Sequence, residues 1–217
     1  MSNIKMWAMV PVLAMAFGIA ATGPALAQDR SVVAQAPAAQ GALFEERILG
    51  RPDAPVTIYE FASMTCPHCA TFHNDILPQI KAAYIDTGKV KLVMREFPFD
   101  RAALAGAMVA RCLPAERFYP FLDVLFKTQR QWATAQDPAR PLQQNARLAG
   151  MSEADFQACV SNGQLADWIL QRRLDATNQF RVESTPTFVF NDGKERIVGA
   201  MPFEDFKKVI DRLLPPG

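Results

Sequence analysis

The spacing of apolar and polar residues changes several times along this chain, and the changes mark where strands and helices are expected. Short runs of β-branched and aromatic residues predict strands, whereas apolar residues three or four positions apart predict helices. Strands are expected at 56–61 and 89–97 and as a hairpin at 187–198, and helices at 66–88, throughout 99–180 and at 203–214. The resulting order is strand, helix, strand, a long helical block, a hairpin and a final helix.

Two prolines fall inside the helical patterns. Pro78 predicts a kink in the helix after the first strand. Pro120 either kinks a helix that begins at Pro114 or starts a new one, and the pattern leaves both possibilities open.

The first 27 residues have the character of an export signal. Lys5 is their one charged residue, an apolar run follows it, and Ala25-Leu26-Ala27 is a small-x-small site for a signal peptidase. We expect a signal peptide at 1–27, because the apolar stretch is shorter than the ~20 residues that a membrane-spanning anchor needs. Residues 28–43 are expected to form a disordered linker, and 44–49 a short docking turn.

Composition and charge narrow the function. Of the 217 residues 50% are hydrophobic, and 23 Lys and Arg against 22 Asp and Glu leave a formal net charge of +1. The chain is therefore apolar enough to bury a core, but it lacks the one-signed field that attracts nucleic acid or an anionic membrane surface. We expect no nucleic-acid partner.

The chain has four cysteines: Cys66, Cys69, Cys112 and Cys159. Disulfides persist in exported proteins, so pairing is expected. Three pairings are possible, and the close spacing of Cys66 and Cys69 favours a local pair that leaves Cys112 for Cys159. The latter two lie on the apolar sides of their predicted helices, which favours a structural disulfide within the helical block. Two buried free thiols are the alternative.

The motif Cys66-Pro67-His68-Cys69 lies where a predicted strand gives way to a helix. Cys66 then sits at the helix N-terminus, where free N–H groups and the helix dipole favour a thiolate, and Pro67 occupies the first turn. We expect Cys66 to be the reactive sulfur and Cys69, one turn later, the resolving thiol. His68 is expected to stabilise the thiolate as an N–H donor or a cation; a solvated turn residue is the alternative.

A structural zinc site is the competing interpretation of the Cys66 and Cys69 pair. Tetrahedral zinc needs two further ligands, and the chain has no second Cys-x-x-Cys motif. His73 with Cys112 or Cys159 would have to complete the set. We instead expect His73 on the exposed side of its helix, and no bound metal.

Pro186 stands at the start of a predicted strand, a position where it has no ladder N–H to give. If the Thr185-Pro186 bond is cis, the backbone of Thr185 would face the redox sulfurs and pair with an extended substrate peptide. An ordinary trans proline is the alternative, and the sequence leaves the isomer open.

These features together resemble the DsbA-type thiol-disulfide oxidoreductases. The resemblance covers about 50–214 and implies an α/β, thioredoxin-like fold with an inserted all-helical domain. The sheet domain would comprise 44–98 and 181–217, and the insert 99–180. Members of the family usually carry valine before the cis proline, so Thr185 is a departure that affects the redox potential.

The resemblance also assigns a role to Glu60, six residues before Cys66. It would be the buried acid beneath the redox pair and would take the proton of Cys69. A solvent-facing edge residue is the alternative.

The function implied is that of an exported dithiol oxidase in the periplasm, a monomer that donates the Cys66–Cys69 disulfide to reduced, folding proteins. A DsbB-like, quinone-linked membrane protein would reoxidise it, and no cofactor besides the redox-active disulfide is expected. The alternatives are a disulfide isomerase or reductase of the same superfamily, and a non-catalytic zinc- or peptide-binding chaperone.

Overall fold

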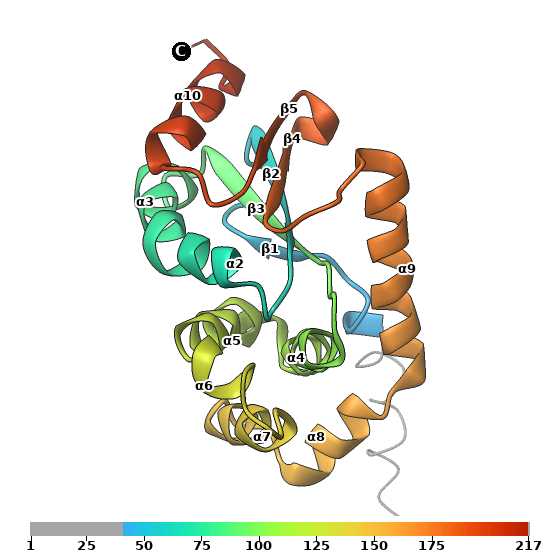
Figure 1. The fold of residues 1–217 in the computed structure, drawn as a ribbon. Coiled ribbons are helices and arrows are strands. Elements are labelled where there is room, and N and C mark those ends of the chain that lie inside the picture. Colours follow the sequence, from blue (N-terminus) through green and yellow to red (C-terminus); the bar gives the residue numbers. More distant parts are fainter. Residues whose placement is uncertain (1–40, 217) are drawn as a thin grey trace, which may run out of the picture. The chain divides into compact units, whose positions relative to one another are not determined.

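The computed structural model describes residues 41–216 (Figure 1). The signal peptide expected at 1–27 and most of the linker expected at 28–43 lie outside this range. Within it, no helix combines the length and the apolar character needed to cross a membrane.

A five-stranded mixed sheet forms the centre, in the order β1-β3-β2-β4-β5. The strands are β1 (Arg47–Leu49), β2 (Val56–Ala62), β3 (Val90–Glu96), β4 (Thr187–Phe190) and β5 (Glu195–Val198). The central pair β2 and β3 is parallel, and the other neighbours are antiparallel. The two predicted strands and the predicted hairpin are therefore present.

The segment before the first predicted strand corrects our expectation of a docking turn at 44–49. Its last three residues form β1, which pairs antiparallel with β3. A strand this short, with the buried charged residue Arg47 in it, shows no alternation in the sequence. Leu43, which we placed in the linker, packs against the core, and its carbonyl accepts a hydrogen bond from Arg111.

One long helical segment follows β2 and covers one face of the sheet. It comprises α2 (Pro67–Thr71) and α3 (Leu77–Ile80), each followed by a π-helical turn, at Phe72–Ile76 and Lys81–Ile85. Pro78 lies in the first turn of α3, and the irregularity expected there takes the form of these two turns. The C-terminal helix α10 (Phe203–Leu213) packs beside α3 on the same face, and α9 lies across the sheet from both (Figure 1).

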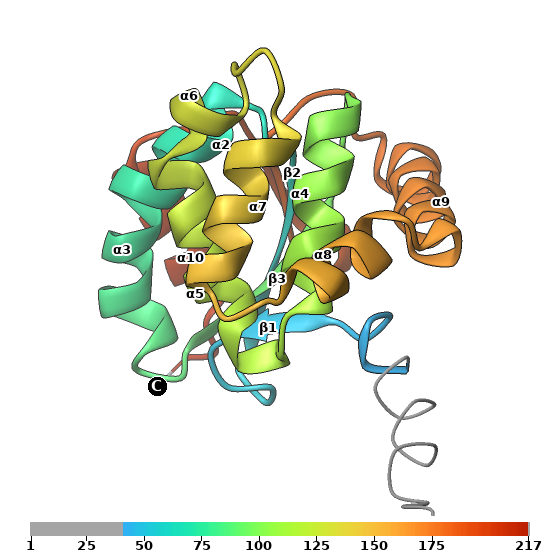
Figure 2. The same ribbon diagram turned by 90° about the horizontal axis from the view of Figure 1, so that it is seen from below.

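The chain between β3 and β4 is helical, as predicted. Its helices are α4 (Arg101–Cys112), α5 (Ala115–Lys127), α6 (Gln129–Trp132), α7 (Ala139–Leu148), α8 (Glu153–Val160) and α9 (Gly163–Phe180), seen from below in Figure 2. Side chains cap three of them: Asp100, Ser152 and Asn162 each accept a backbone N–H three residues on. Pro120 lies inside the continuous helix α5.

The helical insert and the sheet share one hydrophobic cluster, which contains Ile58 and Leu92 of the sheet together with Phe118 and Leu122 of the insert. The division into a sheet domain and an insert at 99–180 stays a prediction about folding units. What the structure shows is that the two parts pack through one apolar core.

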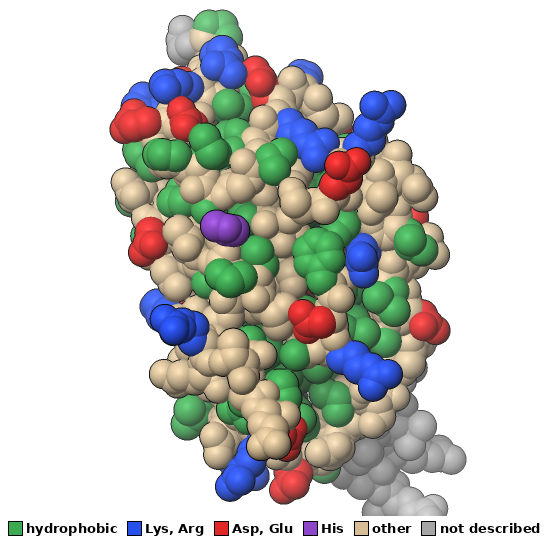
Figure 3. Space-filling model, in the orientation of Figure 1, with side chains coloured by type: hydrophobic (Ala, Val, Ile, Leu, Met, Phe, Trp, Pro, Cys, Tyr) green, Lys and Arg blue, Asp and Glu red, His purple; other side chains and the backbone are tan. Residues whose placement is uncertain are grey.

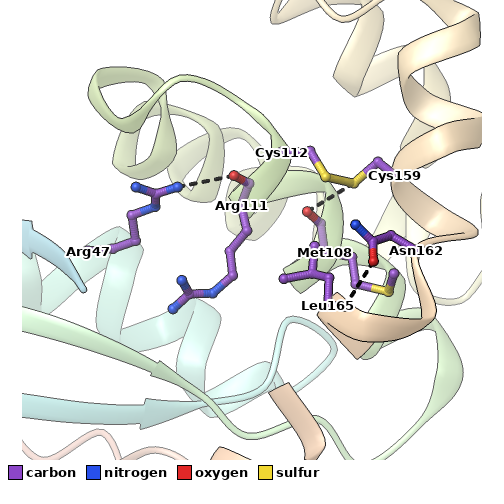
Figure 4. The surroundings of a disulfide bond; sticks show 7 residues. All are labelled: Arg47, Met108, Arg111, Cys112, Cys159, Asn162 and Leu165. Atoms are coloured by element: carbon purple, nitrogen blue, oxygen red, sulfur yellow. Dashed lines mark hydrogen bonds between the residues drawn. A yellow bond between two sulfur atoms is a disulfide. The ribbon is translucent and has the colours of Figure 1, made fainter. Parts of the chain in front are cut away.

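Cys112, at the end of α4, is joined to Cys159 of α8 by a disulfide (Figure 4). The two Cα atoms are 6.2 Å apart, and the cysteines are 47 residues apart in sequence. Beside this bond the buried Arg111 pairs with Glu96 of β3, at 2.6 Å between Nε and Oε1. The disulfide and the ion pair together tie α4 to α8 and to the sheet.

Candidate active site

Cys66 lies at the N-terminus of the helix that follows β2. It is the N-cap of α2 with an extended backbone, and Pro67 takes the first helical position. The Cys66 carbonyl accepts the first helical hydrogen bonds, from Cys69 and Ala70. Cys66 and Cys69 are both free thiols; Cys66 is half-buried and Cys69 fully buried. Only Cys66 is therefore open to attack by another molecule.

The surroundings of Cys66 lower its pKa to about 5. The largest cause is a hydrogen bond from the Cys69 thiol; the Thr185 side chain and the backbone N–H groups of Cys69 and His68 add to it, and burial opposes it. Hydrogen bonds to a thiolate favour the charged form, and N–H groups at a helix N-terminus are oriented to give them. Cys66 is thus a thiolate at neutral pH.

The pKa of Cys69 is shifted in the opposite direction. Burial raises the pKa of its thiol well above the ordinary value, and the charges of Cys66 and Glu60 raise it further. The two sulfurs therefore differ in protonation: near pH 7 the pair holds one proton, and Cys69 carries it.

Pro67 and His68 are exposed, and the backbone N–H of His68 is among the donors that lower the pKa of Cys66. It does so because Cys66 is the N-cap of α2, which directs the first backbone N–H groups of the helix toward its sulfur. That the His68 side chain also stabilises the thiolate stays a prediction.

The Thr185-Pro186 peptide bond is cis, which decides the isomer that the sequence left open. The Cys66 Sγ atom lies 3.3 Å from the Thr185 carbonyl oxygen. Two segments 119 residues apart in sequence thus meet at the reactive sulfur. Pro186 itself is buried, whereas Thr185 is partly exposed beside Cys66.

Glu60 lies in the middle of β2, with Met94 of β3 and Phe188 of β4 opposite it. Its side chain is fully buried, so the alternative of a solvent-facing residue is wrong. Our expectation for His73 is also wrong: its side chain is equally buried, and its Nε2 lies 3.0 and 3.1 Å from the two carboxylate oxygens of Glu60. The apolar pattern of the helix predicts His73 on the exposed side. The pattern does not record that Glu60 of β2 is buried next to this helix and can pair with a buried imidazole.

A family model described as thioredoxin matches residues 44–212. The chain belongs to this thioredoxin family. Its relatives place it among the DsbA-type members. The crystal structure of Wolbachia pipientis α-DsbA1 is 32% identical, with a TM-score of 0.72 over 78% of this chain and 90% of that one. The α/β fold with a helical insert and the resemblance to DsbA proteins are confirmed.

Curated relatives of this chain have names that concern disulfides. The putative protein-disulfide oxidoreductase of Rickettsia bellii is 30% identical over 147 residues, 67% of this chain but 57% of that protein. The chain therefore matches little more than half of that relative's length. Disulfide bond formation protein D of Bacillus subtilis is 27% identical over 199 residues, 86% of this chain and 83% of that protein. Both names fit a DsbA-type chain with two free thiols at a helix N-terminus.

Sequence reasoning missed one residue of this DsbA-type site. Gln129 of α6 is buried, and its Nε2 donates to the carbonyl oxygens of Met64 and Cys66, at 2.9 and 3.0 Å. It connects the insert to the loop that carries the reactive sulfur. A single polar residue 63 positions from Cys66 carries no local pattern that would have identified it.

A second hydrogen-bonded connection runs from the same loop to the start of α4. The Thr65 hydroxyl donates to Asp100 Oδ2 at 2.6 Å, while Oδ1 of the same carboxylate caps α4 by accepting the Ala103 N–H. The loop before Cys66 is therefore held by the insert at two places.

The donors that a zinc site would need are used otherwise. Cys112 and Cys159 are bonded to each other, and His73 Nε2 faces Glu60. Within 41–216 no three His, Cys, Asp or Glu side chains are grouped as metal ligands. The arrangement around Cys66 and Cys69 suits thiol chemistry instead.

Proposed function

We propose that this chain is an exported protein dithiol oxidase, which donates a Cys66–Cys69 disulfide to reduced, folding proteins. The observation that carries the proposal is the placement of the two thiols: Cys66 is the half-buried N-cap of α2, where its pKa is lowered to about 5, whereas Cys69 is fully buried and its pKa is raised. Stabilising the Cys66 thiolate stabilises the reduced protein, and a stable reduced form makes the disulfide oxidising.

The reaction consists of two exchanges. A substrate thiolate attacks Sγ of Cys66, the bond between Cys66 and Cys69 breaks, and Cys69 leaves and takes up a proton. A second substrate thiolate then attacks the substrate sulfur of the mixed disulfide, and Cys66 leaves as a thiolate. The low pKa of Cys66 makes it a good leaving group, which favours this second exchange. The substrate is oxidised by two electrons, and the enzyme ends reduced.

The backbone beside Cys66 supports a polypeptide substrate. Thr185 precedes the cis bond to Pro186 and presents its carbonyl oxygen 3.3 Å from the reactive sulfur. An extended chain that reaches Cys66 passes this backbone, where main-chain hydrogen bonds hold a peptide without regard to its sequence. The face of the molecule drawn in Figure 3 carries hydrophobic side chains and charges of both signs.

Turnover requires an oxidant for the reduced pair. We propose a DsbB-like membrane protein that passes the electrons to quinone, and the periplasm as the location, reached through the signal peptide expected at 1–27. The protein would act as a monomer with no cofactor besides the redox-active disulfide of Cys66 and Cys69.

The test measures whether the protein oxidises or reduces its substrate, as well as how fast it acts. The oxidised protein is mixed with a reduced peptide that holds two thiols, and the protein's redox equilibrium is measured in glutathione buffers. We expect rapid peptide oxidation and a pair more oxidising than glutathione. Efficient insulin reduction with a strongly reducing pair would identify a reductase, and repair of scrambled disulfides an isomerase. Inert thiols would leave a binding module.

A further inference from the structure

A buried carboxylate and a buried imidazole lie together inside the protein, and the imidazole belongs to His73, four residues after the buried Cys69. The side chains of Glu60 and His73 are both 0% exposed, and His73 Nε2 is within 3.1 Å of both carboxylate oxygens. Within residues 41–216, no other side chain donates a hydrogen bond to Glu60. The residues opposite Glu60 on β3 and β4, Met94 and Phe188, are apolar. The orientation of this carboxyl group therefore depends on His73.

The other side of the imidazole has no polar partner. Its ring stacks on Phe126 of α5 at 4.2 Å between centroids and meets the edge of Phe72 at 5.5 Å, and Nδ1 is buried without a hydrogen bond. A proton on Nδ1 would be a buried N–H with no acceptor, which is costly, whereas a bare ring nitrogen costs less. The arrangement that pairs every buried N–H is a neutral His73 with its proton on Nε2, donated to an ionised Glu60.

Glu60 acts in turn on the titratable groups around it. Its charge raises the pKa of the Cys69 thiol on α2, after burial and the effects of Cys66. It also contributes, after burial, to the raised pKa of Tyr119 on α5. Cys69 must gain or lose its proton in each catalytic cycle and has no exposed surface. A group inside the protein has to exchange that proton.

We propose that His73 is a positioning residue for thiol exchange: its Nε2–H orients the Glu60 carboxyl group, so that Glu60 exchanges the proton that Cys69 gains and loses. This inference rests on the proposed function, because it needs Cys66 and Cys69 to form and break a disulfide. It adds to that function the residue that prepares the buried base.

The step is balanced in protons and electrons. When Cys69 closes the disulfide, its S–H bond breaks, the proton moves to a Glu60 oxygen, and Cys69 Sγ attacks Cys66 Sγ in the mixed disulfide. The partner leaves as a thiolate with the electron pair of the broken S–S bond. When the disulfide opens, the proton returns from Glu60 to Cys69. The Nε2–H bond of His73 stays intact throughout.

The protonation state of the imidazole tests the proposal in the unaltered protein. The chain has two histidines, His68 and His73, so nitrogen NMR of the labelled protein assigns each ring. We expect His73 as the neutral form with its proton on Nε2. A proton on Nδ1, or a doubly protonated ring at pH 7, would overturn the proposal.

Two variants of His73 separate its hydrogen bond from its packing. His73→Phe keeps an aromatic ring against Phe126 but removes the donor, whereas His73→Gln keeps an N–H at about the Nε2 position. The reduced protein is mixed with oxidised glutathione, and mass spectrometry of acid-quenched samples follows the mixed disulfide on Cys66 and its closure by Cys69. We expect His73→Phe to slow closure by about tenfold or more, because a positioned base contributes at least this much. Attack by Cys66 should be unchanged, and His73→Gln should restore most of the closure rate.

A double-variant cycle tests whether His73 acts through Glu60. Glu60→Gln should slow closure as well, and adding His73→Phe to it should cause little further loss, since coupled residues are not additive. Asn74→Ala, on the same helix but bonded to the Phe126 carbonyl, is the control and should leave closure unchanged. Melting curves of all variants separate folding defects from slow exchange.

The outcomes separate a failure of the proposed oxidase function from a failure of the proposed role of His73. A wild-type protein that forms no disulfide with glutathione would refute the proposed function. A wild-type protein that exchanges normally, with His73→Phe as fast as wild type in closure or with additive effects in the cycle, would refute the role of His73 alone.

Discussion

The two cysteine pairs of this chain show how one residue type serves different purposes in one fold. Cys66 and Cys69 are three residues apart and are free thiols, whereas Cys112 and Cys159 are 47 residues apart and share a disulfide. Cys66 stands at the N-terminus of a helix. Cys112 ends α4, and Cys159 lies one residue before the end of α8.

The difference teaches that helix polarity and neighbouring donors separate a reactive sulfur from a structural one. At a helix N-terminus the dipole and the free N–H groups stabilise a thiolate, and Thr185 adds to this at Cys66. At a helix C-terminus the dipole disfavours a thiolate. The cysteines of the insert thus sit where the reactive thiolate form is least favoured, and their bond fixes α4 to α8.

The largest effect is expected from replacing Cys66 or Cys69 by serine. Cys66→Ser should abolish disulfide donation, because the other free thiol in the described part of the chain, Cys69, is fully buried. Cys69→Ser should instead accumulate mixed disulfides on Cys66, since nothing displaces the bound partner. Oxidation of a reduced peptide measures the first. Non-reducing electrophoresis after incubation with a disulfide-bonded partner, one sulfur of which leaves as a thiolate when Cys66 attacks the other, measures the second. Equal accumulation in the two variants would remove the distinction between attacking and resolving sulfur.

The second pair should matter for stability and little for chemistry. The chain-entropy model gives a loop of this length up to about 4 kcal/mol of stabilisation. The double variant Cys112→Ala, Cys159→Ala should therefore melt several degrees lower in calorimetry, yet retain most peptide oxidation at moderate temperature. Loss of oxidation in a variant that is still folded would mean that the insert disulfide shapes the redox site directly.

Gln129 links the helical insert to the loop before Cys66. Its loss should affect both stability and peptide oxidation. Gln129→Leu leaves the Met64 carbonyl without its donor, at a cost of about 1–3 kcal/mol for a buried polar group. We expect a lower urea midpoint and slower peptide oxidation, because the loop before Cys66 is held less firmly. Gln131→Leu, at an exposed glutamine two residues on, is the matched control. If Gln129→Leu changes neither the urea midpoint nor the rate of peptide oxidation, the loop before Cys66 does not need the hydrogen bonds of Gln129.

Substitutions beside Cys66 sharpen the account of its thiolate. Thr185→Val removes a side-chain hydrogen bond and should raise the pKa of Cys66 above about 5. His68→Ala keeps the backbone N–H and should raise it less. Titration of the thiolate ultraviolet absorbance measures both pKa shifts. A larger shift for His68→Ala than for Thr185→Val would show that the imidazole stabilises the thiolate more than the Thr185 side chain does.

The pH dependence of stability should distinguish the reduced from the oxidised protein. The pKa of Cys66 is about 5 in the folded state, and a free cysteine titrates near 8.5, so the unfolded reduced chain binds the extra proton between these values. Stability from Cys66 therefore rises with pH across this window and is lost as pH falls through about 5. The raised pKa of Cys69 has the opposite sign and acts only above about 8.5. Urea midpoints of the reduced form should rise between pH 5 and 8 relative to those of the oxidised form, in which neither thiol titrates.

The order of elements and the place of the redox motif were predictable because local signals determine them. The β-branched run before Cys66 and the proline after it suffice to predict a cysteine at a strand-to-helix junction. The apolar spacing of 99–180 likewise predicts a helical insert. The short strand β1 escaped prediction because three residues carry too little pattern.

What the sequence by itself determined is thus the local chemistry: which thiol stands at a helix N-terminus, and which segments are strands or helices. The tertiary structure alone decided which distant groups surround that thiol. The cis bond before Pro186 meets Cys66, Gln129 reaches Cys66 from the insert, and His73 turns inward to Glu60. These contacts escaped prediction because each joins separate elements of the fold, and a polar residue is stable in the interior only when its partner is there, which no local pattern records.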